Sequence, residues 1–172
     1  MSTLDVQSPR GQVAVRDEER AVALFEQRYP NYRYCHTDKQ TMAKLDGMIW
    51  HRDDRLAYLV LTSCRYDCTL DTFAGWDWEW LVTWRKLQQG AIISRYLQAP
   101  LLGFLYVVDQ QTLLVQTLYN PVFPPAQRWR TPIRVDRTVT QATINGGRVM
   151  RWNAFIKIDK AQRLADDSIP LA

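Results

Sequence analysis

Residues 45–65 read LDGMIWHRDDRLAYLVLTSCR and carry the pattern that decides the fold. Side chains 56–61 form a continuous apolar run, which is typical of a strand buried on both faces of a sheet. The charged residues 51–55 before that run predict a turn. Asp46-Gly47 lies inside another strand, expected over residues 41–50, so the stretch predicts two consecutive strands joined by a turn.

The residues before this stretch predict a helix and a short strand. Asp17 can cap a helix because its side chain meets free backbone N–H groups, and Pro30 ends that helix. A short strand is expected over residues 32–35. The small and polar residues 1–15 predict a flexible N-terminal arm.

The residues after this stretch predict a loop, a long helix and two pairs of strands. Residues 64–75 are polar and rich in turn-forming types, whereas residues 76–97 repeat apolar side chains with the period of a helix. Asn145-Gly146 is a strong turn signal between the last two strands because both residues tolerate positive φ. The four strands are expected over residues 101–108, 112–119, 133–140 and 148–158.

Length and composition exclude several classes of protein. The 172 residues suit one domain, and 47% hydrophobic residues are too many for a disordered chain. No apolar stretch reaches the roughly 18 residues that a membrane-spanning helix needs, and the first residues lack the apolar block of a secretory signal. Three cysteines, an odd number, argue against a secreted disulfide scaffold, so we expect a cytoplasmic protein.

Positive charge is concentrated in one segment of the chain. Residues 128–163 hold nine Lys or Arg and only two acidic residues, whereas the whole chain has a net charge of +4. This segment predicts either an ordinary solvated sheet face or a surface that follows the phosphates of nucleic acid. Trp129 and Trp152 lie beside arginines and could stack on bases or be covered by arginine stems. The candidate nucleic-acid-binding residues are Arg128, Arg130, Arg134, Arg137, Arg148, Arg151 and Lys157.

The expected elements follow the order helix, three strands, helix, two strands and an extra C-terminal strand pair. This order makes the fold α/β or α+β. With Asp46-Gly47 in the strand before the buried strand, it resembles the PD-(D/E)XK, or restriction-endonuclease-like, nuclease superfamily. Residues 17–119 match the α-βββ-α-β core of that superfamily, which has a mixed central sheet, inside a single domain over residues 16–172. Residues 128–163 are then a basic β extension of the core.

The resemblance implies a metal site that this sequence supplies only in part. In the superfamily, an Asp at the end of one strand and a Glu on the next bind Mg²⁺, which compensates the negative charge that develops during phosphodiester cleavage. A Lys two residues after the Glu activates the attacking water. Asp46 fits the first position, but residues 61–65 hold neither an acid nor a Lys. Leu61 or Ser63 stands in place of the second acid, so the resemblance implies a degenerate site.

A relocated acid would complete such a site. Some superfamily members supply the Glu from the following helix, and Glu79 and Lys86 share one face of the expected long helix. Under this hypothesis the catalytic residues are Asp46, Glu79 and Lys86, and Asp46 and Glu79 bind the Mg²⁺. The competing interpretations are that Glu79 and Lys86 form the wet side of an amphipathic helix and that Asp46 only forms a turn. A contribution from Glu26 is a further alternative.

Other reactive side chains form no recognised motif. The three cysteines and two histidines could hold zinc, but no Cys-x2-Cys pair is present, and scattered cysteines are commonly buried. Gly146-Gly147 is not followed by Lys and a helix, so it is a turn and not a phosphate-binding loop.

Three functions remain open from the sequence. The leading hypothesis is a phage or mobile-element protein, because residues 140–147 and 151–154 look like those of small phage-encoded members of the superfamily. It would be catalytically degenerate and would bind nucleic acid, DNA foremost, or a protein that handles nucleic acid, in the cytoplasm of a bacterial host. The first alternative is an active Mg²⁺-dependent DNA endonuclease or exonuclease. The second is a protein-interaction or structural phage protein, for which we expect a large exposed apolar patch beside the basic strands.

Overall fold

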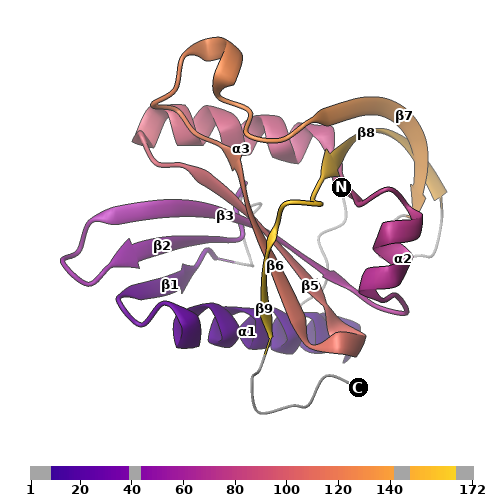
Figure 1. The fold of residues 1–172 in the computed structure, drawn as a ribbon, viewed down its shortest axis with the longest axis horizontal. Helices are drawn as coiled ribbons and strands as arrows, with labels where there is room; N and C mark the ends of the chain where they lie inside the picture. Colours follow the sequence, from indigo (N-terminus) through magenta and orange to yellow (C-terminus); the bar gives the residue numbers. More distant parts are fainter. Residues whose placement is uncertain (1–8, 39–43, 142–147, 166–172) are drawn as a thin grey trace.

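Three α-helices and nine strands make up residues 9–38, 44–141 and 148–165, the part of the chain that the computed structural model describes (Figure 1). The strands build one six-stranded and one three-stranded sheet, so the fold is mixed α/β, as the sequence predicts. In chain order the elements are α1 (Pro9–Arg28), β1 (Tyr32–His36), β2 (Gly47–His51), β3 (Leu56–Arg65), α2 (Leu70–Gly75), β4 (Glu79–Thr83), α3 (Trp84–Leu97), β5 (Leu101–Val107), the 3-10 turn η1 (Val108–Gln110), β6 (Thr112–Tyr119), the 3-10 turn η2 (Pro125–Gln127), β7 (Ile133–Gln141), β8 (Arg148–Lys157) and β9 (Gln162–Ala165).

The six-stranded sheet is mixed and has the strand order β1-β2-β3-β5-β6-β9. Every neighbouring pair is antiparallel except β3 and β5, which run parallel with Leu59 opposite Leu101 and Arg65 opposite Val107. Parallel neighbours need a crossover connection, which α2, β4 and α3 supply between β3 and β5. The predicted mixed central sheet is therefore confirmed.

Helices cover both faces of this sheet. In Figure 1, α1 lies below the strands and α3 lies above them, and each helix packs on its own hydrophobic core. Neighbouring residues of β5 consequently join different cores: Phe104 packs with Phe25 of α1, and Leu105 belongs to the core that contains Leu87 of α3. All of β5 and the middle of β3 are buried, which explains their continuous apolar sequences.

The three-stranded sheet has the order β4-β8-β7 and is antiparallel throughout. β7 and β8 pair from Ile133 opposite Ile156 to Gln141 opposite Arg148, which confirms the predicted pair of basic strands. Figure 1 shows these two strands arching away from the six-stranded sheet, whereas β4 runs directly into α3. β9, which the sequence did not predict, follows β8 and pairs with β6 of the large sheet.

The long helix predicted over residues 76–97 is wrong in its first third. α3 begins at Trp84, and the residues before it form strand β4. Positive φ angles of 55° at Asp77 and 56° at Trp78 interrupt any helix there. In β4 the side chains of Trp80 and Val82 are buried, and their neighbours are less buried. This burial pattern has the period of two that is typical of a strand. The four-residue spacing of the tryptophans, which is typical of a helix, conceals it in the sequence.

Helix α1 starts earlier than the sequence indicates. It begins at Pro9, which suits the first helical position because proline lacks an N–H that would be unpaired there. Residues 9–15 of the expected arm are therefore helical, and residues 1–8 lie outside the described residues. Asp17 does not cap this helix, because it lies within α1, where its buried carboxylate accepts hydrogen bonds from Tyr66 Oη at 2.9 Å and Arg20 Nη1 at 3.1 Å. Neither α1 nor any other described helix is long and apolar enough to cross a membrane.

Two smaller differences concern the loops. The strand expected over residues 41–50 begins at Gly47 as β2, and its residues 41–43 lie outside the described residues, as does the turn expected at residues 145–147. The loop expected over residues 64–75 contains the end of β3 and the short helix α2. Thr69 caps α2 through reciprocal hydrogen bonds with Thr72, a capping box that stabilises even a helix this short.

Candidate functional site

Asp46 precedes β2 and is held between β1 and β3 by its backbone. Its N–H donates to the carbonyl oxygen of Val60 at 3.0 Å, and its own carbonyl oxygen accepts from the N–H of Thr37 at 3.2 Å. Its carboxylate oxygen Oδ2 accepts a hydrogen bond from the backbone N–H of Thr62 at 2.7 Å. These contacts fix the position of the carboxylate beside β3.

Gly47 leaves room for the phenol ring of Tyr34 next to Asp46. A Cβ atom at position 47 would collide with the ring and the hydroxyl of Tyr34 on the neighbouring strand β1. Burial raises the pKa of the Tyr34 hydroxyl above its ordinary value, and the negative charge of Asp46 raises it further. Close packing between β1 and β2 therefore explains the Asp-Gly pair, which begins a strand and does not form a turn.

Lys86 of α3 provides the counter-ion of Asp46. Its Nζ lies 3.0 Å from Oδ1 and 2.7 Å from Oδ2 of Asp46, so one ammonium group binds both carboxylate oxygens. The side chain of Asp46 is 16% exposed and that of Lys86 is 36% exposed, so water screens the pair only in part. The structure brings these two predicted site residues together, and a cation of the protein itself lies where the carboxylate would bind a metal ion.

Leu61, which stands beside Asp46, is one of the two positions, with Ser63, where the resemblance implies a second acid. Gly47 pairs with Val60 in the antiparallel register of β2 and β3, so Leu61 is the next residue of β3 alongside Asp46. The side chain of Leu61 is fully buried in the core under α3. An isobutyl group cannot bind a cation, and the core around it is filled by apolar side chains. The carboxylate of Asp46 therefore has no acidic neighbour on β3.

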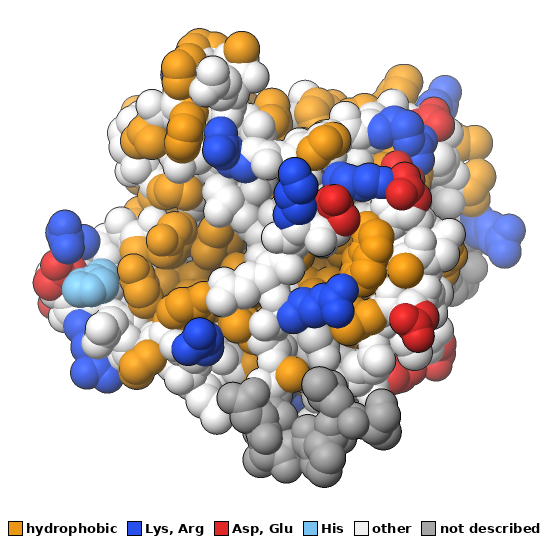
Figure 2. All heavy atoms as spheres, in the orientation of Figure 1, with side chains coloured by type: hydrophobic (Ala, Val, Ile, Leu, Met, Phe, Trp, Pro, Cys, Tyr) orange, Lys and Arg blue, Asp and Glu red, His pale blue; other side chains and the backbone are white. Residues whose placement is uncertain are grey.

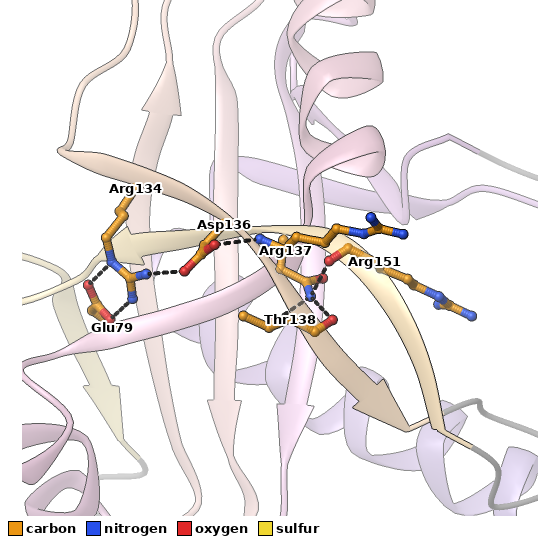
Figure 3. A network of polar contacts seen from close by, with 7 residues as sticks. Glu79, Arg134, Asp136, Arg137, Thr138 and Arg151 are labelled. Atoms are coloured by element: carbon orange, nitrogen blue, oxygen red, sulfur yellow. Dashed lines mark hydrogen bonds and ion pairs between the residues drawn. The ribbon is translucent and has the colours of Figure 1, made fainter.

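Glu79 does not join Asp46 and Lys86. It lies on β4, where its Oε2 binds Nη2 of Arg134 on β7 at 2.9 Å (Figure 3). This hydrogen bond raises the pKa of the Arg134 guanidinium above its ordinary value, and the same guanidinium contacts Asp136 at 3.5 Å and covers the ring of Phe155. The prediction that Glu79 and Lys86 share one face of a helix is wrong, because residues 79–83 form a strand.

The described residues contain no ready-made metal centre. No group of three or more His, Cys, Asp or Glu side chains that could hold a metal ion is present in residues 9–38, 44–141 and 148–165. Glu26, the further alternative, accepts a hydrogen bond from the backbone N–H of Tyr34 at 2.8 Å. Glu79 is bound to Arg134 and adds no ligand beside Asp46. Each of the two expected metal ligands, Asp46 and Glu79, is instead paired with a cationic side chain of the protein.

The candidate nucleic-acid-binding residues lie before and on the paired strands β7 and β8, which we call the basic ribbon. Several of their charged groups are already occupied by neighbours. Arg128 Nε donates to the carbonyl oxygen of Phe123 at 3.1 Å, and the guanidinium of Arg130 lies over the Phe123 ring. Lys157 Nζ binds the carboxylate of Asp77 and donates to its carbonyl oxygen at 2.6 Å. Lys157 thus ties the ribbon to the residues before β4, whereas Arg128 and Arg130 hold the loop that precedes β7.

Three arginines of the basic ribbon are not occupied in this way. The guanidinium groups of Arg137, Arg148 and Arg151 make no hydrogen bond or ion pair with any described residue. Figure 3 shows Arg137 and Arg151 extending away from the chain of contacts that joins Glu79, Arg134 and Asp136. In Figure 2, Lys and Arg side chains lie on the side of the molecule where β7 and β8 are, with Asp and Glu side chains among them. The distal part of the ribbon therefore carries positive charge that no described residue compensates.

Apolar side chains are exposed on the basic ribbon between these arginines. Only Trp152 was a candidate from the sequence, on account of its position next to Arg151. The mixture of apolar and charged residues over 135–139 and 148–152 is the available signal for the others. The exposed apolar residues of the ribbon are Val135, Val139, Val149, Met150 and Trp152.

The chain thus has two candidate sites, a carboxylate bound by its own lysine and a ribbon with free arginines. Comparison of the chain with protein-family models, with curated proteins and with solved structures gives no match. The function is therefore argued from the chemistry of these two sites.

Proposed function

We propose that this chain is a nuclease-like protein that no longer cleaves and that binds nucleic acid through the basic ribbon. The observation that carries the proposal is the set of three arginines, Arg137, Arg148 and Arg151, without a partner among the described residues. A guanidinium group matches phosphate oxygens in charge and in hydrogen-bond geometry. DNA is the first polymer to test. A phage or mobile-element origin and a location in the cytoplasm of a bacterial host belong to the same proposal.

The order and direction of the elements support a restriction-endonuclease-like core. α1 is followed by the antiparallel strands β1, β2 and β3, and a crossover that ends in α3 leads to β5, which lies parallel to β3. This is the α-βββ-α-β layout that the resemblance implies. Asp46 lies directly before β2, whereas the resemblance implies the first metal ligand at the end of a strand.

The surroundings of Asp46 support the loss of cleavage. Metal-dependent phosphodiester cleavage needs several hard oxygen ligands around one Mg²⁺ ion. Here the ammonium group of Lys86 binds both carboxylate oxygens, and Leu61 takes the place of the second acid. The ion pair of Asp46 with Lys86 is then a structural contact that ties α3 to the sheet.

A titration at two salt concentrations tests the binding half of the proposal. Fluorescence anisotropy of labelled single-stranded and duplex DNA would be measured at about 50 mM and about 200 mM salt, because phosphate contacts make the affinity fall with salt. We expect binding at the lower salt. The triple variant R137A/R148A/R151A is expected to flatten the slope of log affinity against log salt by about two to three.

A second triple variant controls for the loss of positive charge. R52A/R85A/R95A removes three exposed arginines that lie outside the ribbon. It should keep both the affinity and most of the salt slope of the parent chain. Absence of binding at low salt, or equal losses in the two triple variants, contradicts the proposal.

A protein partner is the second candidate, and the exposed apolar side chains of the ribbon favour it. Val139, Met150 and Trp152 lie beside the free arginines, as a protein-binding patch would require. Binding to a protein through such a patch depends less on salt than binding to phosphates does. Absence of binding to both single-stranded and duplex DNA at low salt supports this second candidate.

A further inference from the structure

The two faces of the basic ribbon carry different side chains. In an antiparallel pair, residues opposite one another share a face, and successive residues of a strand alternate between faces. Arg137 is opposite Trp152, and Val139 is opposite Met150, so these four side chains lie on one face. Arg148 lies two residues before Met150 and joins them. We call this surface the Trp152 face.

The Trp152 face is open from Arg148 to Trp152, whereas Ala154 and Ile156 on the same face are buried. Trp152 is 58% exposed, Val139 52% and Met150 50%. On the opposite face Asn153 is fully buried, and the ring of Phe155 is covered by the guanidinium of Arg134. A ligand that approaches the ribbon can therefore spread over an indole, a thioether and a valine only on the Trp152 face.

Positive charge flanks this apolar centre. Arg137 lies directly across from Trp152, and Arg148 lies four residues along β8 from Trp152, which is about 13 Å in an extended strand. No described residue of the Trp152 face is acidic, because Asp136 lies on the opposite face, where it contacts Arg134. The face thus combines an aromatic platform with two cations that have no partner among the described residues and can bind an anionic chain.

We infer that the Trp152 face binds single-stranded nucleic acid, with unpaired bases stacked on Trp152 and backbone phosphates held by Arg137 and Arg148. This inference rests on the proposed function and specifies the form of its ligand. Met150 and Val139 extend the apolar surface on which a neighbouring base lies. Binding of this kind reads the faces of the bases and the charge of the backbone, so it tolerates many sequences.

Single strands fit this face better than a duplex does. In a duplex the bases are stacked on one another, and a protein reaches only their edges and the phosphates. In a complex with a duplex, the arginines would bind the phosphates, but the exposed indole of Trp152 would have no base to stack on. An unpaired base offers a free π surface, and stacking of such a base on an aromatic side chain is the usual way in which proteins hold single strands.

Three ligands of equal length separate stacking from charge. Fluorescence anisotropy at about 50 mM salt would compare an oligothymidylate, the corresponding duplex and an abasic strand that has phosphates but no bases. We expect the oligothymidylate to bind about tenfold more tightly than either of the others. Trp152→Ala should weaken the binding of oligothymidylate by about tenfold and leave the binding of the abasic strand unchanged, whereas Trp152→Phe should restore part of the loss.

Tyr96→Ala provides the matched control for this experiment. Tyr96 is an aromatic residue on α3 that is 90% exposed and lies outside the ribbon, so its removal should change none of the three affinities. Thermal melts of all variants check that the fold is intact.

The outcomes distinguish this inference from the proposed function. Duplex binding as tight as single-strand binding, or equal losses for oligothymidylate and the abasic strand in Trp152→Ala, overturns the inference. If such binding still depends on salt and on the ribbon arginines, the proposed function stands. Absence of binding to all three ligands overturns both and indicates a protein partner.

Discussion

The indole ring of Trp80 on β4 packs directly on Gly103 of β5 and joins the three-stranded sheet to the six-stranded sheet. A Cβ atom at position 103 would lie 2.5 Å from Cζ3 of Trp80 and 3.1 Å from the methyl carbons of Leu118. Trp80 is the largest side chain that is fully buried in the described part of the molecule. The close approach of the two sheets at this point therefore requires a residue without a side chain.

Gly103→Ala is expected to lower the free energy of unfolding by about 1–3 kcal/mol, because an added methyl group overpacks a filled core. Urea denaturation followed by far-UV circular dichroism measures the change. Gly75→Ala is the control, since a Cβ atom there meets nothing within 4 Å, and it should change the stability by less than about 0.5 kcal/mol. Equal changes in the free energy of unfolding for Gly103→Ala and Gly75→Ala would contradict close packing between the two sheets at Gly103.

The ion pair between Lys86 and Asp46 should contribute measurably to stability. A double-mutant cycle with Lys86→Met and Asp46→Asn is expected to give a coupling energy of about 1–2 kcal/mol, between the values for exposed and buried pairs. The exposed pair of Arg55 with Asp53, at 2.7 Å, should give a smaller coupling energy in the same measurement. A coupling energy near zero for Lys86 and Asp46 contradicts a structural role for the pair.

Cleavage assays decide whether Asp46, Glu79 and Lys86 form a working nuclease site. We expect the parent chain, Asp46→Ala and Glu79→Gln to leave plasmid and linear DNA intact with Mg²⁺ or Mn²⁺, because Glu79 is bound to Arg134 and Asp46 to Lys86. Glu79→Gln should lower the stability only slightly, because water screens the ion pair that is lost. Metal-dependent cleavage by the parent chain that either substitution abolishes would establish an active enzyme instead.

Alkaline pH should destabilise the protein through Tyr34. Burial raises the pKa of its hydroxyl in the folded state, so the folded protein holds this proton more tightly than the unfolded chain does. The resulting stability is complete below the unfolded pKa of about 10 and is lost as the pH rises through the folded pKa. Urea denaturation between about pH 8 and 11 would show the decline.

Tyr34→Phe should reduce the slope of this decline without abolishing it, because burial also raises the pKa of Tyr58 and Tyr106. Tyr96→Phe, at a side chain that is 90% exposed, should leave the slope unchanged. A slope that is the same in the parent chain and in Tyr34→Phe assigns the alkaline loss to other groups.

Local patterns in the sequence predicted the buried strands and the basic strand pair. The apolar runs of β3 and β5 and the mixture of basic and apolar residues in β7 and β8 are properties of a few consecutive residues, so they can be read without the fold. β4 was missed because Trp76, Trp80 and Trp84 repeat with a helical spacing, and only the pairing with β8 selects a strand. β9 was missed because four residues carry too short a pattern, and its pairing with β6 is a long-range contact.

Part of the site was predicted correctly, but the prediction rested on a helix that is shorter than expected. Asp46 and Lys86 do meet, although the helix that carries Lys86 begins only at Trp84. Strand β4 precedes α3 and so places Lys86 beside the sheet. The same strand directs the side chain of Glu79 toward Arg134. No local sequence pattern shows that Lys86 contacts Asp46 while Glu79 contacts Arg134. Both contacts depend on which strand, distant in the sequence, lies beside β4.

The pairing of β4 with β8 has a consequence for how the chain is made in a cell. Synthesis proceeds from the N terminus, so β3, α3, β5 and β6 leave the ribosome while the hydrogen-bonding edge of β4 still lacks its partner. During this interval the open edge can pair with other nascent chains, which is the usual route to aggregation of an exposed strand. Slow translation before residue 157 would therefore increase the dependence of this protein on chaperones.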